Sequence, residues 1–231
     1  MLKNTIANLK VIRKVALALG PLNKRVVYVG GATVSLYVND PAAEDVRPTK
    51  DLDISLDIAT LGELEAVREQ LAKKGFSQTA EDNVICRFRY EDIKVDVMST
   101  KAIGWAPANP WFEPGFVHRE TVMVEDQQVQ ILPLSYFLAS KFNAFCGRGA
   151  RDPRTSHDFE DIIYIMDNRI DFIEQLRYTP SDVKSYLLQQ MQNILHNRAM
   201  QEAIYGNLFH VTREARYQRI IAAVKQISSW G

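Results

Sequence analysis

Cysteine is scarce in this chain of 231 residues, where only Cys86 and Cys146 are present. Two cysteines cannot build a disulfide framework, and neither has the metal-ligand spacing that a cysteine zinc site requires. Both lie in segments with an apolar periodicity, so we expect two buried, free thiols. A single disulfide between them stays an alternative, although nothing in the sequence points to an oxidising compartment.

The sequence also has no long apolar run. A membrane-spanning helix needs about 20 consecutive apolar residues, and no segment approaches that length. The first residues, Met1 to Ile6, lack the apolar core and cleavage site of a secretory signal. We therefore expect a cytoplasmic protein with no membrane partner.

Net charge gives no indication of a partner, because 28 basic and 28 acidic residues cancel at pH 7. Their distribution is uneven: residues 1–25 carry basic side chains and no acidic ones, whereas residues 26–130 are rich in Asp and Glu. This distribution suits a metal site flanked by surfaces that accept polyanions. For most of these residues, solvated charge on helix faces is the simpler interpretation.

Two common phosphate-binding loops are absent. The sequence contains neither the Gly-Lys-Ser/Thr of a Walker A loop nor the G-x-G-x-x-G of a dinucleotide-binding fold. It has instead a strand-like run, Val26–Val29, followed directly by Gly30 and Gly31 and a short helical segment over 32–38. Glycines let the backbone approach a ligand, and N–H groups just before a helix bind anions. Gly30 and Gly31 are therefore candidates for holding a phosphate.

Two acids, Asp51 and Asp53, alternate along the next strand-like run. Residues two apart in a strand point to the same face, so these carboxylates are expected side by side. Asp96, on the second strand of a hairpin expected over 84–98, can add a third carboxylate to that face. Such a set binds one or two divalent ions, and Asp96 can serve as the third ligand or as the base for an incoming hydroxyl. The plainer alternative is the polar outer face of an antiparallel sheet.

The apolar periodicity divides the chain into two parts. Up to about residue 132 strands and helices alternate, which predicts an α/β (α+β) unit with a mixed sheet and flanking helices, and only helices follow. The expected domains are therefore 1–132 and 133–231. Expected helices cover 3–19, 32–38, 61–74, 134–145, 156–166, 171–178, 181–204 and 212–228, and expected strands cover 26–29, 51–57, 84–90, 93–98, 117–124 and 129–132.

The order of these motifs resembles the nucleotidyltransferase superfamily of the DNA polymerase β type. That superfamily carries Gly-Gly or Gly-Ser, then Asp-x-Asp on a strand, then a later strand aspartate. Gly30-Gly31-Ala32-Thr33 and Arg47-Pro48-Thr49-Lys50-Asp51-Leu52-Asp53 are similar to the AbiEii-type branch, which has Arg-x-Thr-x-Asp-x-Asp. The resemblance covers residues 25–167 and implies a nucleotidyltransferase fold.

The resemblance also implies roles for individual residues. Metal binding falls to Asp51, Asp53 and Asp96, and neutralisation of triphosphate charge falls to Lys141, on the expected helix 134–145. The residues expected to contact the nucleotide are Gly30, Gly31, Thr33, Arg47, Thr49 and Asp158.

Two features depart from the family pattern. His157 stands where the downstream motif Arg-x-Lys-Asp-x-x-Asp has lysine, although both acids, Asp158 and Asp161, are kept. The interval between Gly31 and Asp51 is also long, with 40–48 as the expected extra loop, and such surface insertions cost little.

By resemblance, the protein is expected to be the toxin of a toxin–antitoxin pair that moves a nucleoside monophosphate from a nucleoside triphosphate to an acceptor, with magnesium. RNA is the expected acceptor, with transfer RNA as one candidate. Arg148, Arg151 and Arg154 either hold acceptor phosphates or form a solvated loop. Two alternatives stay open: an antibiotic-type, small-molecule nucleotidyltransferase, and a non-catalytic nucleotide-binding protein of the same fold.

Overall fold

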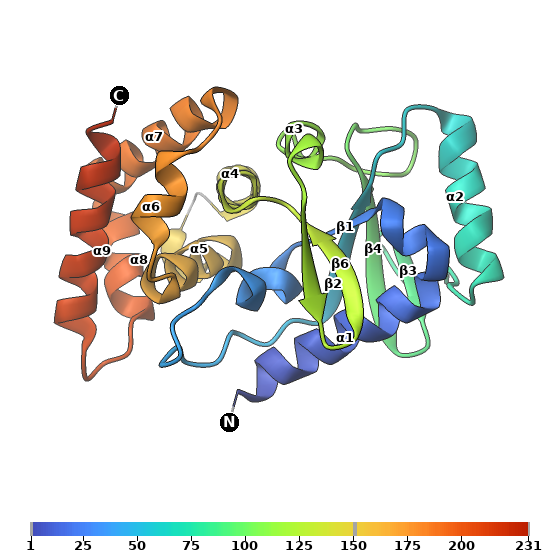
Figure 1. Ribbon diagram of the computed structural model, residues 1–231, viewed down its shortest axis with the longest axis horizontal. Coiled ribbons are helices and arrows are strands. Elements are labelled where there is room, and N and C mark those ends of the chain that lie inside the picture. Colours follow the sequence, from blue (N-terminus) through green and yellow to red (C-terminus); the bar gives the residue numbers. More distant parts are fainter. Residues whose placement is uncertain (1, 150–151, 231) are drawn as a thin grey trace. The chain divides into compact units, whose positions relative to one another are not determined.

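The computed structural model describes residues 2–149 and 152–230, and the chain divides into two compact units. The first unit comprises Met1–Leu36 and Glu44–Pro133, and the second comprises Tyr37–Ala43 and Leu134–Gly231. All the strands of the sheet lie in the first unit, and the described part of the second unit is built from helices and loops (Figure 1). The expected fold class is confirmed. The division into independent domains over 1–132 and 133–231 stays a prediction.

The strands of the first unit form one mixed sheet in the order β3-β4-β2-β1-β6-β5. β1 pairs antiparallel with β2 and parallel with β6, β2 pairs parallel with β4, and β3–β4 and β5–β6 are hairpins. Every residue of β1 is buried, as expected for a central strand covered on both faces. The strands are β1 (Val26–Val29), β2 (Asp51–Leu56), β3 (Arg87–Tyr90), β4 (Ile93–Ser99), β5 (Glu120–Val124) and β6 (Gln127–Ile131).

The helices of the first unit follow their apolar periodicity. α1 (Lys3–Leu19) contacts β5 and β6, and α2 (Leu61–Lys73) begins with a capping box between Thr60 and Glu63. The short α3 (Phe112–Val117) was not expected within its proline-rich segment. It buries Phe112 and Phe116, which are one helical turn apart.

The short helix expected over 32–38 begins and ends one residue earlier. It is a tighter 3₁₀ helix over Gly31–Tyr37. Both the N–H and the hydroxyl of Thr33 donate to the carbonyl oxygen of Gly30, at 3.4 and 2.9 Å. These three-residue bonds close the turn immediately after β1.

The second unit packs around α4, whose residues Leu134 to Phe142 are all buried. A helix that is buried all round belongs in the interior of its unit. The helices are α4 (Leu134–Ala144), α5 (His157–Asn168), α6 (Phe172–Arg177), α7 (Ser181–His196), α8 (Arg198–Asn207) and α9 (Arg213–Ser228).

The prediction of one long helix over 181–204 is wrong. α7 ends at His196, and Asn197 adopts an extended conformation with φ −113° and ψ 104°. The Asn197 side chain accepts a hydrogen bond from the N–H of Met200, so it caps the start of α8. An apolar periodicity that continues across a capping residue therefore conceals two helices.

Both cysteines are free thiols, but only Cys86 is buried, so the expectation for Cys146 is wrong. Cys146 follows the end of α4 in a short π-helical turn over Phe145–Gly149, beyond the buried part of that helix. Within residues 2–149 and 152–230, no helix has both the length and the apolar character needed to cross a membrane.

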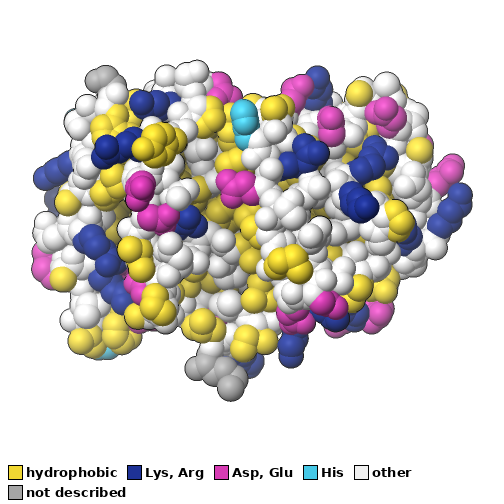
Figure 2. Space-filling model, viewed as in Figure 1, with side chains coloured by type: hydrophobic (Ala, Val, Ile, Leu, Met, Phe, Trp, Pro, Cys, Tyr) yellow, Lys and Arg dark blue, Asp and Glu magenta, His cyan; other side chains and the backbone are white. Residues whose placement is uncertain are grey.

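Opposite charges are interspersed on the face that Figure 2 shows, in keeping with the zero net charge. Within the first unit, the basic N-terminal segment is partly neutralised by the turns of the two hairpins. Arg13 Nε lies 2.6 Å from Asp126 Oδ1, and Lys14 Nζ lies 2.6 Å from Glu91 Oε2. Exposed pairs of this kind contribute little to stability.

Candidate active site

The sheet brings three predicted acids to one face. β2 and β4 run parallel with Asp53 directly opposite Asp96, and Asp51 lies two residues before Asp53 on β2. These carboxylates are partly exposed, whereas Leu52 and Ile54, which point to the other face, are buried. Strand register thus produces the carboxylate cluster, by which we mean Asp51, Asp53 and Asp96.

An unexpected basic residue, Arg87, contacts two acids of this cluster. Arg87, on β3, is the antiparallel register partner of Asp96. Its Nε and one terminal nitrogen lie 2.7 Å from the two carboxylate oxygens of Asp96, and the same terminal nitrogen lies 2.9 Å from Asp51 Oδ2. These charge-assisted bonds, above all those to Asp96, raise the pKa of the Arg87 guanidinium above its ordinary value.

Gly30 is required by Asp53. Gly30 follows the last residue of β1, Val29, whose register partner on β2 is Asp53. Gly30 has φ +76°, and a Cβ atom added to it would lie 1.8 Å from Asp53 Oδ2 and 2.6 Å from Asp53 Cγ. Only glycine therefore allows the carboxylate to pack against this turn.

Four more residues expected to contact the nucleotide lie on the segments around this turn and strand: Gly31, Thr33, Arg47 and Thr49. Asp158, the last of that set, lies on α5 of the second unit. Gly31 begins the 3₁₀ helix, and Thr33 is fully buried with its hydroxyl bonded to Gly30. Thr49 donates to the carbonyl oxygen of Asp51 at 3.3 Å, and the Arg47 guanidinium lies 3.5 Å from the carbonyl oxygen of Pro48. Their contact with a nucleotide stays a prediction.

The expected extra loop before β2 is attached to the start of α1. Asp45 accepts hydrogen bonds from the N–H groups of Asn4 and Thr5, at 2.6 and 2.8 Å, and Asn4 donates to the carbonyl oxygen of Val46. Partial burial alone would raise the pKa of the Asp45 carboxyl, but these hydrogen bonds lower it. The loop thereby supplies two helix N–H groups with an acceptor.

The chemistry of the cluster suits magnesium, which prefers oxygen ligands. Its present geometry is different, because Arg87 bridges Asp51 and Asp96. In the described part of the chain, no group of three or more His, Cys, Asp or Glu side chains is arranged to hold a metal. Burial, together with the charges of Asp96 and Asp53, raises the pKa of the nearby Cys86 thiol to about 11, so it stays protonated at neutral pH.

In the second unit, Lys141 lies in a buried ionic cluster. Its ammonium nitrogen lies 2.7 Å from Asp161 Oδ2 and 3.2 Å from Asp158 Oδ1. Both acids are on α5, which begins after Ser156, whose side chain accepts from the N–H of Phe159. Only 6% of the Lys141 side chain and 2% of the Asp161 side chain are exposed. Lys141, on α4, is therefore held firmly against α5.

A family match covers most of the chain. The family model described as "Nucleotidyl transferase AbiEii toxin, Type IV TA system" matches residues 15–227. The chain belongs to this family. Membership makes the protein an enzyme of the nucleotidyltransferase class, in a family of toxins from type IV toxin–antitoxin systems.

Two solved structures share the AbiEii chain's fold. An antigenic nucleotidyltransferase-like protein from Paracoccidioides brasiliensis is 18% identical, with a TM-score of 0.50, over 85% of this chain and 91% of that chain. JHP933 from Helicobacter pylori is 12% identical, with a TM-score of 0.50, over 97% of this chain and 92% of that chain. At these identities the likeness concerns the fold alone. None of the curated protein sequences compared with the chain matches it.

The basic loop of this AbiEii-family chain is largely engaged with acids. Arg148 pairs with Asp158 at 3.0 Å. Arg154 lies 2.9 Å from Asp152 and 3.2 Å from Glu202. The third arginine, at position 151, lies outside the described residues. Both described arginines are more than half exposed, so they can still exchange these partners for phosphates.

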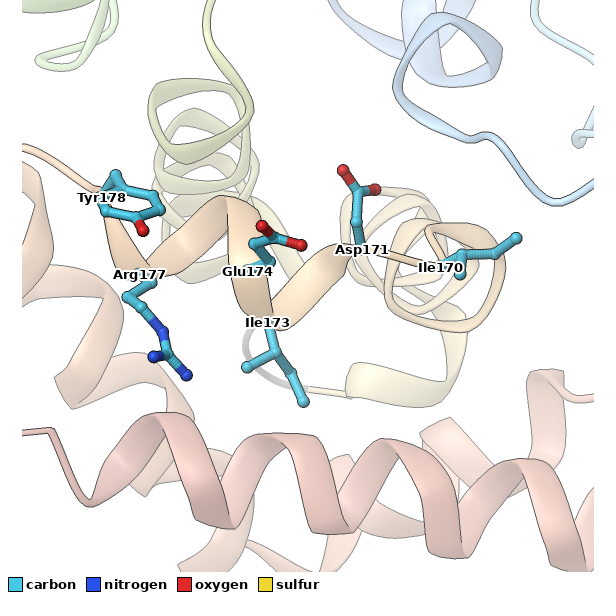
Figure 3. Close-up of a pocket in the computed structure, with 6 residues that line it drawn as sticks. All are labelled: Ile170, Asp171, Ile173, Glu174, Arg177 and Tyr178. Atoms are coloured by element: carbon cyan, nitrogen blue, oxygen red, sulfur yellow. The ribbon is translucent and has the colours of Figure 1, made fainter.

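The second unit also has a hollow of about 410 Å³ along α6. In Figure 3, Asp171, Glu174 and Tyr178 lie on one side of the helix, and Ile173 and Arg177 point to the other. None of the predicted site residues lines it, and its two acids would repel a triphosphate, so we do not place the nucleotide there. The lining residues are Ile170, Asp171, Ile173, Glu174, Arg177 and Tyr178.

Replacing Gly30 with alanine is expected to damage the site of this AbiEii-family enzyme. The positive φ costs about 1–3 kcal/mol for a residue with a side chain, and the added Cβ cannot coexist with the present position of Asp53. A displacement of about 1 Å at a reacting centre lowers the rate about 100-fold. We expect that loss in a nucleotidyl-transfer assay, together with the loss of stability in thermal unfolding.

Gly75→Ala is the matched control. Gly75 has φ +87°, but the nearest atom to an added Cβ is Tyr90 Cε2 at 3.7 Å, an ordinary contact. This variant should share the strain and keep the activity. Equal activity losses in the two variants would show that Gly30 acts through stability alone.

Proposed function

We propose that this enzyme transfers a nucleoside monophosphate from a nucleoside triphosphate to a hydroxyl or phosphate of an acceptor, in a magnesium-dependent reaction. The observation that carries the proposal is the strand register that sets Asp53 opposite Asp96 and on one face with Asp51. The close packing of Gly30 on Asp53 supports it, because it brings bare backbone to the carboxylates.

Asp51, Asp53 and Asp96 would hold the magnesium. When bound, magnesium supplies positive charge that stabilises the attacking and leaving oxygens of a displacement at phosphorus. The N–H groups at Gly30 and Gly31 would donate to phosphate oxygens. From the family pattern, we also propose that Thr33, Arg47, Thr49 and Asp158 contribute to nucleotide binding, and that Lys141 neutralises triphosphate charge.

The proposed step is a substitution at the α-phosphorus. An acceptor oxygen forms a new bond to that phosphorus, the bond to the bridging oxygen of the β-phosphate breaks, and pyrophosphate leaves with its electron pair. When the acceptor is a hydroxyl, Asp96 has an alternative role as the base instead of the third ligand: it accepts the proton of the hydroxyl and later passes it to water. Asp96 can do this only after its two oxygens are no longer both occupied by Arg87.

We propose RNA as the acceptor, supported by the exposed arginines of the loop over 148–154 and by the toxin family. Arg148 and Arg154 have exposed side chains that phosphates can reach. Membership of a type IV toxin–antitoxin family also supports an antitoxin as a partner. The alternative acceptor is a small molecule of the antibiotic type.

The test is label transfer from nucleoside triphosphates carrying α-³²P, with magnesium and total RNA. We expect label in RNA, no label in the presence of EDTA, and recovery when magnesium is added in excess. A parallel reaction offers hydroxylated and amino-substituted antibiotics in place of RNA. Label in an antibiotic and none in RNA would show that the acceptor is a small molecule. No label in any acceptor, with all four nucleotides, would favour a non-catalytic nucleotide-binding protein.

A further inference from the structure

Arg87 occupies the oxygens that a metal ion would use. Three of its contacts go to Asp96 Oδ1, Asp96 Oδ2 and Asp51 Oδ2, all within 2.9 Å. Only 14% of the Arg87 side chain and 14% of the Asp96 side chain are exposed, and 36% of Asp51. The pairing is therefore a partly desolvated, two-pronged contact, which is the strong form of this interaction.

The charge of the cluster explains why a cation is needed there. Asp51, Asp53 and Asp96 share one face, and like charges that close repel one another. Arg87 supplies a positive charge that a divalent ion could supply instead. The two cations cannot both take the same oxygens of Asp96 and Asp51, so they compete.

The position of Arg87 also allows it to leave. β3 lies at one end of the strand order, and within residues 2–149 and 152–230 its outer edge is paired only at the isolated bridge between Ser77 and Arg89, two residues beyond Arg87. The long side chain can move outward to water without breaking the pairing of β2 with β4, which holds the carboxylates in place. Release of Arg87 therefore opens the cluster while its register is kept.

We propose that Arg87 is a resident counter-ion of the carboxylate cluster, which a divalent cation displaces from Asp51 and Asp96 when it binds. The inference rests on the proposed function, because it assigns the cation to the same carboxylates. It makes Arg87 a positioning residue, which keeps the acids together before the cation arrives and sets how tightly they then take it.

The test is a titration of the nucleotide-free protein with Mn²⁺, in which electron paramagnetic resonance measures the free Mn²⁺. Replacing Arg87 with methionine removes the competing charge and keeps an unbranched side chain. We expect the dissociation constant for Mn²⁺ to fall by about tenfold or more, since the competing bonds are charge-assisted. In EDTA the same variant should unfold at a lower temperature than the wild type. Added Mn²⁺ should raise the unfolding temperature of the variant by more than it raises that of the wild type.

Arg89→Met is the matched control. Arg89 lies two residues further along β3 and makes the same two-pronged contact with Asp82, at 2.7 and 3.0 Å. Its removal should leave Mn²⁺ affinity unchanged within about twofold, because Asp82 is not part of the cluster. Adding Asp53→Asn to Arg87→Met should remove the gained affinity, which assigns the ion to the cluster.

Unchanged or weaker Mn²⁺ binding by Arg87→Met would overturn the proposal, since it would show that Arg87 orients Asp96 for the ion or acts only in folding. If that variant does not fold, Arg87→Lys decides, because lysine keeps the charge but not the two-pronged contact. Its affinity should then exceed that of the wild type, and an unchanged value would overturn the proposal. Tighter Mn²⁺ binding by Arg87→Met, with no label transfer by the wild type, would reject the proposed function but support the role of Arg87 as a counter-ion. Label transfer by the wild type, with no tighter Mn²⁺ binding by Arg87→Met, would support the proposed function but reject the counter-ion role.

Discussion

Replacing Asp53 with asparagine is expected to lower nucleotidyl transfer by about 10³-fold, in line with the loss of a strong electrostatic contact at a reacting centre. Asp53 is central to the cluster, because it shares a strand with Asp51, faces Asp96 across the β2–β4 pairing and packs on Gly30. An amide of nearly the same shape keeps these packing contacts but loses the charge that would hold magnesium.

The stability of Asp53→Asn should not fall with its activity. Removing one of three neighbouring negative charges reduces their repulsion, so the unfolding temperature in EDTA should equal or exceed that of the wild type. The two measurements are label transfer at saturating nucleotide and thermal unfolding followed by circular dichroism. Lost activity with retained stability is the signature of a functional residue, because a structural one would lose both.

Asp57→Asn is the control for Asp53→Asn. Asp57 follows the end of β2, is exposed, and accepts a hydrogen bond from the hydroxyl of Thr100 at 2.9 Å. It carries the same charge on the same segment, outside the cluster, so its amide should transfer label at close to the wild-type rate. A rate of label transfer by Asp53→Asn within about threefold of the wild-type rate would contradict the role of the cluster. A change that small is no larger than the effect of an ordinary surface substitution.

Local patterns were sufficient to predict that the three acids of the cluster share one face of the sheet. Alternation along β2 sets Asp51 and Asp53 on one face, and the hairpin carries Asp96 beside them. The position of Arg87 opposite Asp96 could also have been found in the sequence. A two-residue turn at positions 91 and 92 pairs 90 with 93, and counting outward then pairs Arg87 with Asp96.

Contacts between distant segments could not be predicted in the same way. Asp45 accepts from the start of α1, 41 and 40 residues earlier, and no periodicity connects those positions. Asn197 was hidden because the apolar stripe continues through it, although asparagine is a strong capping residue. Asp158 was expected to contact the nucleotide, but its contact with Lys141 joins two helices, and Asp161 lies closer still to the ammonium and is more deeply buried.

Replacing Lys141 with methionine is expected to lower the free energy of unfolding by about 3–5 kcal/mol, the cost of leaving a buried charge without its partner. Methionine has a similar length, so little cavity forms and the measurement reports mainly on charge. Loss of the Lys141 charge affects Asp158 less than Asp161, because Asp158 also pairs with Arg148 and is more exposed. The measurement is unfolding by urea, followed by circular dichroism at neutral pH.

The double variant Lys141→Met with Asp161→Asn tests the cause of that loss. Neutralising Asp161, whose side chain is only 2% exposed, removes the unpaired charge, so most of the lost stability should return. The double variant Lys141→Met with Asp158→Asn should recover less stability, because Asp158 is still paired with Arg148 when Lys141 is replaced. A loss below about 1 kcal/mol in the single variant, typical of an exposed pair, would contradict the prediction. It would show that the ion pair between Lys141 and Asp161 contributes little to the stability of the fold.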